Sequence, residues 1–122
     1  MRILIVEDDP ETARLIRDLL ELQDYTVIEA SNGLSVMRII NEHVPDLIFM
    51  DINLPGMDGI TLTKLIKSDA RTGKIPVIAL TSAPLKSDRE RFILIGCDGC
   101  ISKPFHVQEI LDIIEEYKKS RD

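Results

Sequence analysis

Five short apolar runs alternate with amphipathic stretches along this chain of 122 residues. The runs lie at about residues 3–6, 25–30, 46–50, 74–80 and 99–102, and apolar residues recur at helical spacing in the segments between and after them. Strands that alternate with helices of about 10 to 15 residues indicate βαβ units and a parallel sheet. Right-handed crossovers then place helices on both faces of the sheet. The pattern predicts an α/β, doubly wound fold in one domain over residues 1–122.

Four of the predicted helices carry an apolar face that we expect to pack on the sheet. Helices are expected to begin near residues 9, 32, 58, 87 and 107. Asp9 followed by Pro10 is typical of an N-cap and a first helical position, which favours a helix cap over a metal ligand at Asp9. The residues predicted to point inward are Ala13, Ile16, Leu19, Leu20, Leu34, Met37, Ile40, Ile60, Leu62, Leu65, Ile66, Val107, Ile110, Leu111, Ile114 and Tyr117.

The bulk composition argues against several classes of function. A net charge of -6 disfavours unaided binding of nucleic acid, because phosphate contacts require clustered lysine and arginine. No apolar run approaches the roughly 20 residues of a membrane span, and the apolar start of the chain is too short for a signal peptide. We therefore expect a cytoplasmic protein without a membrane partner.

The two cysteines, Cys97 and Cys100, have the spacing of a redox or zinc motif. A single pair with no second pair and no histidine at a suitable distance is weak evidence for such a site. Cysteine is also a common small residue of protein cores. Both residues are therefore interpreted as reduced thiols, as expected for a protein without an export signal.

Polar side chains follow four of the five predicted strands at the point where each strand ends. In a parallel sheet these carboxyl ends lie along one edge, and ligands bind there where the strand order reverses. Several carboxylates at one edge repel each other, and a hard divalent cation such as Mg²⁺ relieves the repulsion. The polar residues at these ends are Glu7, Asp8, Asp9, Asp51, Thr81, Ser82 and Lys103.

These residue types suit the transfer of a phosphoryl group. Lys103 supplies a cation for a phosphoryl oxygen, and Thr81 supplies a hydroxyl donor. Phosphoryl transfer depends mostly on positioning and charge neutralisation, and a carboxylate can itself act as the nucleophile. Asp51 is the best-placed nucleophile, because it ends the apolar run 47–50 where cations can gather around it.

The whole chain resembles, in order, the receiver domain of two-component response regulators, of the stand-alone type. The matching features are the acidic pair Glu7-Asp8, Asp51 with the following loop 52–59, Thr81, and Lys103-Pro104-Phe105. The family implies a flavodoxin-like five-stranded parallel sheet of order 2-1-3-4-5 with five helices. It also implies that Asp51 is the phosphoacceptor and that the peptide bond between Lys103 and Pro104 is cis.

The resemblance further implies a Mg²⁺ site and a phosphoryl site. Asp8 and Asp51 would be direct metal ligands. Glu7 would act through water, and Asn53 would add its backbone carbonyl. The residues that would hold the phosphoryl group are Thr81, Ser82 and Lys103.

Partners also follow from the resemblance. The phosphoryl group would come from a phosphohistidine of a histidine kinase or a histidine phosphotransfer protein, and a downstream output protein would bind the result. Such a module modifies itself, with autodephosphorylation at most, and is not a turnover enzyme.

Two features depart from the usual pattern of the family. Receivers usually carry Tyr, Phe or His at the switch position three residues before the strand-five lysine, and this chain has Cys100 there. The fourth predicted helix also ends in an unbroken apolar run, Phe92-Ile93-Leu94-Ile95. A helix with one buried face would interrupt such a run, so we expect at least one of these residues to be exposed. We hypothesise that this face, with the fifth strand and the fifth helix, docks an output protein or a second copy, and a broader buried face is the alternative.

Two other functions stay open at this point. One is an interaction module of the same fold that does not depend on phosphorylation, an alternative that Cys100 supports. The other is a small Mg²⁺-dependent phosphohydrolase. The sequence disfavours this enzyme, because Ile52-Asn53 rather than a second acid follows Asp51 and the chain is too short for a substrate cap.

Overall fold

The computed structural model describes residues 1–54, 58–82 and 86–121, and it contains one parallel sheet of five strands. The strands are β1 (Arg2–Val6), β2 (Thr26–Ala30), β3 (Leu47–Asp51), β4 (Val77–Thr81) and β5 (Gly99–Ser102). Their order across the sheet is β2-β1-β3-β4-β5, and every neighbouring pair is parallel. The predicted fold and strand order are therefore confirmed. Residues 55–57 of the loop that follows β3 lie outside the described residues.

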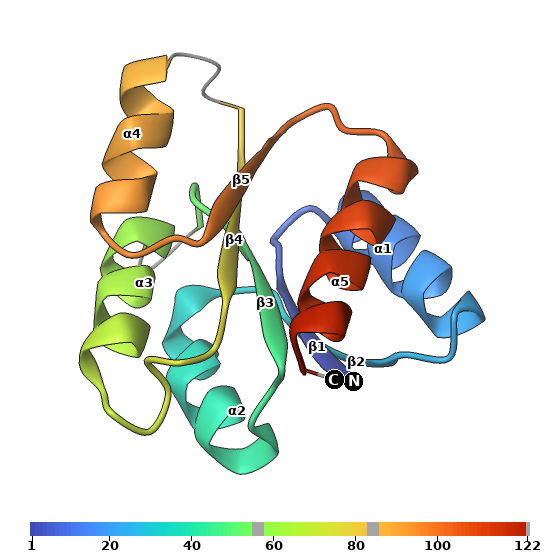
Figure 1. Cartoon of the computed structure of the whole chain (residues 1–122), viewed down its shortest axis with the longest axis horizontal. Coiled ribbons are helices and arrows are strands. Elements are labelled where there is room, and N and C mark those ends of the chain that lie inside the picture. Colours follow the sequence, from blue (N-terminus) through green and yellow to red (C-terminus); the bar gives the residue numbers. More distant parts are fainter. Residues whose placement is uncertain (55–57, 83–85, 122) are drawn as a thin grey trace.

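Helices cover both faces of this sheet (Figure 1). They are α1 (Pro10–Leu22), α2 (Val36–His43), α3 (Gly59–Ser68), α4 (Lys86–Leu94) and α5 (Val107–Arg121), and a short 3₁₀ turn, η1 (Gly33–Ser35), precedes α2. In Figure 1, α1 and α5 lie together on one side of the sheet, and α2, α3 and α4 lie on the other. This is the arrangement that right-handed crossovers produce. Among the described helices, none has both the length and the apolar character that crossing a membrane requires.

The alternation of side chains along the strands divides the interior into two cores. Leu4, Ile48 and Val77 point toward α2, α3 and α4, whereas Ile3, Phe49 and Ile78 point toward α1 and α5. All five residues of β3 are buried, and so are all five of β4. A strand that is covered on both faces reads as a continuous apolar run, which explains why the runs were visible in the sequence.

Three residues that the helical spacing placed inward are exposed instead. Leu34 has 77% of its surface exposed, because it lies in η1, and α2 begins only at Val36. The amide groups of Leu34 and Ser35 are bound by the side chain of Asn32, which caps η1 and sets this later start. Val36 and Ile40 are the residues of α2 that fill the core.

Leu65 and Val107 are the other two exceptions, with 42% and 41% of their surface exposed. The buried side of α3 is centred on Leu62 and Ile66, so Leu65 lies at its margin. Val107 is the first residue of α5, where the chain has only begun to approach the sheet. In both cases the sequence placed the helix correctly, and the rotation of the helix against the sheet decided which apolar residues are covered.

Candidate functional site

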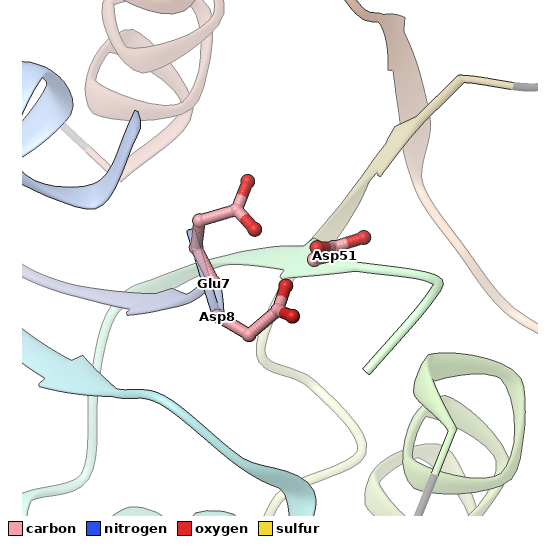
Figure 2. Close-up of side chains that lie close together, drawn as sticks. All are labelled: Glu7, Asp8 and Asp51. Atoms are coloured by element: carbon pink, nitrogen blue, oxygen red, sulfur yellow. The ribbon is translucent and has the colours of Figure 1, made fainter. Parts of the chain in front are cut away.

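Three carboxylates meet at the carboxyl edge of the sheet. Glu7 and Asp8 directly follow β1, and Asp51 is the last residue of β3. Each supplies an oxygen atom, and these three atoms lie within 4.8 Å of one another. Figure 2 shows the carboxylates grouped across the gap between the ends of these two strands. Glu7 and Asp51 are buried, each with 3% of its surface exposed, whereas Asp8 is exposed to solvent.

Lys103 provides the cation that the two buried acids need. Its ammonium nitrogen, Nζ, lies 2.6 Å from Oε1 of Glu7 and 3.3 Å from Oδ2 of Asp51. Lys103 follows β5, and its backbone N–H donates to the carbonyl oxygen of Thr81 at 2.7 Å. The peptide bond between Lys103 and Pro104 is cis, as predicted. A buried carboxylate is costly without a partner, so this lysine stabilises the cluster in its resting state.

The two buried acids, Glu7 and Asp51, differ in pKa. Burial raises the pKa of Glu7 to about 7, and Asp51 acts in the same direction while Lys103 opposes it. Burial alone would also raise the pKa of Asp51. Hydrogen bonds from Glu7 and from the backbone of Asn53, together with the charge of Lys103, outweigh that effect and lower it. Asp51 is thus held ionised, which is the state required of a nucleophile.

The loop after β3 is shaped around Asp51. The backbone N–H of Asn53 donates to Oδ1 of Asp51 at 2.9 Å, and the N–H of Gly59 donates to the carbonyl oxygen of Ile52 at 3.0 Å. A Cβ atom at Gly59 would lie 2.5 Å from the carbonyl oxygen of Asp51. The chain therefore packs against itself here at a distance that only glycine allows. Gly59 lies in the loop 52–59 that follows Asp51 in the sequence, and its role in this close approach was not predicted.

Hydroxyl groups lie at the ends of the neighbouring strands. Leu80 pairs with Asp51 in the sheet, so Thr81 lies one position beyond the acid on the adjacent strand. Thr81 is buried and pairs with Ser102 of β5, and Ser82 is exposed. The strand ends therefore bring Thr81 to the same edge as Lys103 and Asp51, as the sequence analysis predicted. Asp9 occupies the N-cap position of α1, and its carboxylate accepts from the hydroxyl of Thr12 at 2.5 Å rather than from the backbone.

The cluster fits a magnesium ion. Mg²⁺ prefers oxygen ligands and commonly uses one or two carboxylates together with waters. Glu7, Asp8 and Asp51 supply converging carboxylate oxygens, and the exposure of Asp8 leaves a side open to water. A groove of about 470 Å³ beside Glu7 and Asp8 reaches between α1 and the end of β2.

The described residues also settle several secondary predictions. Cys97 is buried and Cys100 is half-buried, both are free thiols, and burial raises the pKa of Cys97 to about 11. In the apolar run at the end of α4, Phe92 is buried, whereas Ile93 and Leu94 have 60% and 85% of their surface exposed. The expectation that at least one of these residues is exposed is confirmed.

Comparison with known proteins decides the family. The family described as the response regulator receiver domain matches residues 3–115. The chain is a response regulator receiver domain. This receiver domain is 43% identical over 115 residues to the polar-differentiation response regulator DivK of Brucella anthropi, and the alignment covers 94% of each chain.

Solved structures of receiver domains have the same fold. The receiver domain of a sensor histidine kinase from Pseudomonas aeruginosa is 32% identical, with a TM-score of 0.86 and 95% of each chain covered. That protein has a magnesium ion coordinated in its active-site cleft. The BeF₃-activated N-terminal receiver domain of RstA from Klebsiella pneumoniae is 29% identical, with a TM-score of 0.89, covering 96% of this chain and 97% of that one.

Membership of the family narrows the functional alternatives. Receiver domains are signalling proteins that interact with histidine kinases and output partners, and they generally bind Mg²⁺ through an acidic cluster of this kind. The chain is accordingly a signalling protein and not a turnover enzyme. The phosphohydrolase alternative finds no support.

Proposed function

We propose that Asp51 is the phosphoacceptor of this receiver domain and that the donor is a phosphohistidine of a histidine kinase or a histidine phosphotransfer protein. The observation that carries the proposal is the environment of Asp51. Its carboxylate is buried, ionised, and in contact with Lys103 at the edge where Glu7 and Asp8 converge. Electrostatic positioning of this kind is what phosphoryl transfer requires of a protein.

The chemical step is a displacement at phosphorus. A carboxylate oxygen of Asp51 forms a bond to the phosphorus atom, and the bond between phosphorus and the imidazole nitrogen of the donor breaks. The leaving nitrogen keeps the electron pair. The product is an acyl phosphate on Asp51, which water later hydrolyses back to the carboxylate.

The metal ligands in this proposal come from two segments, the ends of β1 and β3. Asp8 and Asp51 would bind Mg²⁺ directly, Asn53 would add its backbone carbonyl, and Glu7 would act through water. When bound, Mg²⁺ supplies charge neutralisation at the phosphoryl oxygens. The hydrogen bond from Asn53 to Asp51 supports this arrangement, because it holds the loop beside the acid.

Lys103, Thr81 and Ser82 would hold the phosphoryl group. At rest, Lys103 bridges Glu7 and Asp51, so its ammonium group already lies beside the reacting carboxylate. A phosphoryl oxygen on Asp51 can then replace the carboxylate oxygen as the partner of Lys103. Thr81 would donate its hydroxyl from the end of β4, and Ser82 lies next in the chain.

The output of this module would be altered binding to a downstream protein in the cytoplasm. The exposed side chains of Ile93 and Leu94, together with β5 and α5, would form the face that contacts the output protein or a second copy. A phosphorylation-independent interaction module is the second candidate. Cys100 favours it, because a small half-buried thiol stands where the family has an aromatic switch.

The experiment is incubation with Mg²⁺ and a small acyl-phosphate donor, followed by intact mass measurement. We expect an adduct with the mass of one phosphoryl group, lost in Asp51→Asn and after removal of Mg²⁺ by a chelator. Asp112→Asn is the matched control, because Asp112 is an exposed acid of α5. An adduct that persists in Asp51→Asn would reject Asp51 as the acceptor, and no adduct under any condition would favour the phosphorylation-independent module.

A further inference from the structure

A polar contact joins α4 to the end of β5, next to the candidate site. The guanidinium group of Arg89 donates to the hydroxyl oxygen of Ser102. Arg89 lies within α4, and Ser102 is the last residue of β5 and directly precedes Lys103. The contact therefore connects the helix to the residue adjacent to the lysine that pairs with Asp51.

Ser102 is connected to the site in two ways, because it precedes Lys103 in the sequence and its backbone pairs with that of Thr81. It pairs with Thr81 in the sheet, and the N–H of Lys103 donates to the carbonyl oxygen of Thr81 at 2.7 Å. The ends of β4 and β5 are thus linked where the phosphoryl group would lie. A displacement of the Lys103 backbone would therefore also act on Ser102 and Thr81.

α4 itself has few contacts with the core. Among the residues of α4 whose side chains the structure describes, 88–94, only Phe92 is buried. α3, in comparison, contributes the buried residues Leu62, Thr63 and Ile66 in addition to Gly59. A helix with so little buried surface is held weakly and can take a second position at modest cost. The contact between Arg89 and Ser102 adds to this weak attachment.

The same contact lies beside the unusual switch position. Cys100 is on β5, two residues before Ser102, and the charge of Arg89 acts on its thiol. A cysteine has no ring that could move between an outer and an inner position. A polar contact between helix and strand, in contrast, has two discrete states, made and broken.

We propose that the contact between Arg89 and Ser102 is a clasp that holds α4 in its resting position, and that phosphorylation of Asp51 opens it. The proposal rests on the proposed function, because the opening is driven by the phosphoryl group. Lys103 exchanges a carboxylate partner for a phosphoryl oxygen, the end of β5 follows, and Ser102 leaves Arg89. Ile93 lies one helical turn after Arg89, so release of the clasp repositions the exposed apolar end of α4.

Linkage gives the proposal a quantitative consequence. If the clasp is open in the phosphorylated state, a variant that cannot form the clasp needs less free energy to reach that state. Arg89→Met keeps the length of the side chain and removes the donor. Its affinity for beryllofluoride, a mimic of the phosphoryl group, should exceed that of the wild type about three-fold, because an exposed hydrogen bond contributes modestly.

The test measures hydrogen exchange of the α4 amides in the full chain, with and without Mg²⁺ and beryllofluoride. In the wild type, exchange of α4 should rise several-fold when the mimic is added. In Arg89→Met and in Ser102→Ala, exchange should be raised before addition and should change little afterwards. Arg91→Met is the matched control, because Arg91 is an exposed arginine of the same helix, and it should behave as the wild type.

The outcomes separate the clasp from the proposed function. If beryllofluoride binds but α4 exchanges equally in the wild type and Arg89→Met in both states, the clasp is overturned. If Arg91→Met has the same effect as Arg89→Met, the effect is one of helix charge and the clasp is also overturned. If the wild type neither binds beryllofluoride nor forms an adduct with an acyl-phosphate donor, the proposed function fails. In that case the clasp is tested separately: it is rejected if the α4 amides exchange equally fast in Arg89→Met and in the wild type without added ligand.

Discussion

At the scale of single residues, the resting site is a balance between buried acids and one lysine. Lys103 contacts both Glu7 and Asp51, and these acids are almost fully buried. Within the described residues, this lysine is the only cation with a salt bridge to either of them. The same acids are the candidate ligands of Mg²⁺, so the lysine and the metal ion compete electrostatically for one negative region.

Replacing Lys103 with methionine should therefore strengthen the binding of Mg²⁺ and lower the free energy of unfolding of the metal-free protein. Loss of one positive charge at this distance should raise the affinity for Mg²⁺ by about ten-fold, after allowance for solvent screening. Titration of Mg²⁺ followed by NMR shifts of the Asp51 region measures this affinity. Lys119→Met, at an exposed position of α5, is the control. A weaker affinity in Lys103→Met would contradict the competition.

At the scale of elements, the site depends on how closely the start of α3 packs under the end of β3. Asp58 caps α3 by accepting from the N–H of Thr61 at 2.8 Å, and Gly59 follows as the first residue of the helix. The missing side chain of Gly59 lets the backbone approach Asp51 and Ile52. The position of the acid thus depends on a helix that carries none of the candidate ligands.

Gly59→Ala should lower the free energy of unfolding by about 2–3 kcal/mol, because a Cβ atom would lie 2.5 Å from one backbone atom and 2.7 Å from another. Urea denaturation measures the change. Gly99→Ala is the matched control, since its Cβ would meet only the flexible end of Ile78, at 3.1 Å, and it should cost less than about 1 kcal/mol. Equal losses in the two variants would show that the approach at Gly59 does not limit stability.

At the scale of the whole molecule, the site gathers the ends of strands that are far apart in the sequence. Glu7 follows β1, Asp51 ends β3 and Lys103 follows β5, and the three residues meet only when the sheet is complete. A ligand that binds this cluster therefore binds the folded chain and not the unfolded one. Binding must then raise the free energy of unfolding of the whole domain.

Mg²⁺ at ten times its dissociation constant should stabilise the protein by about 1.4 kcal/mol, which corresponds to a rise in Tm of about 5 °C for a domain of this size. The stabilisation should be lost in Asp8→Asn, whose exposed side chain is not needed for the fold. Calorimetry with Na⁺ at matched ionic strength as the control measures the shift. An undiminished shift in Asp8→Asn would exclude Asp8 as a ligand.

Local patterns along the chain were enough to predict the helices and strands, their order in the sequence, and the polar chemistry at the strand ends. Strands covered on both faces must be apolar throughout, and acids and a lysine at the ends of such strands stand out for that reason. The family resemblance added the strand order and the cis bond before Pro104, and both are present.

Features that depend on the rotation of helices and on distances between segments could be established only from the folded chain. No local sequence pattern predicts three of these features. They are the ion pair of buried Glu7 with Lys103, the exposure of Leu34, and the contact between Arg89 and Ser102. Helical spacing fixes which residues share a face, but the packing of that face against the sheet is a property of the whole chain. The identity of the residues around Asp51 could therefore be predicted from the sequence, whereas the ion pairs of Lys103 with Glu7 and Asp51 could not.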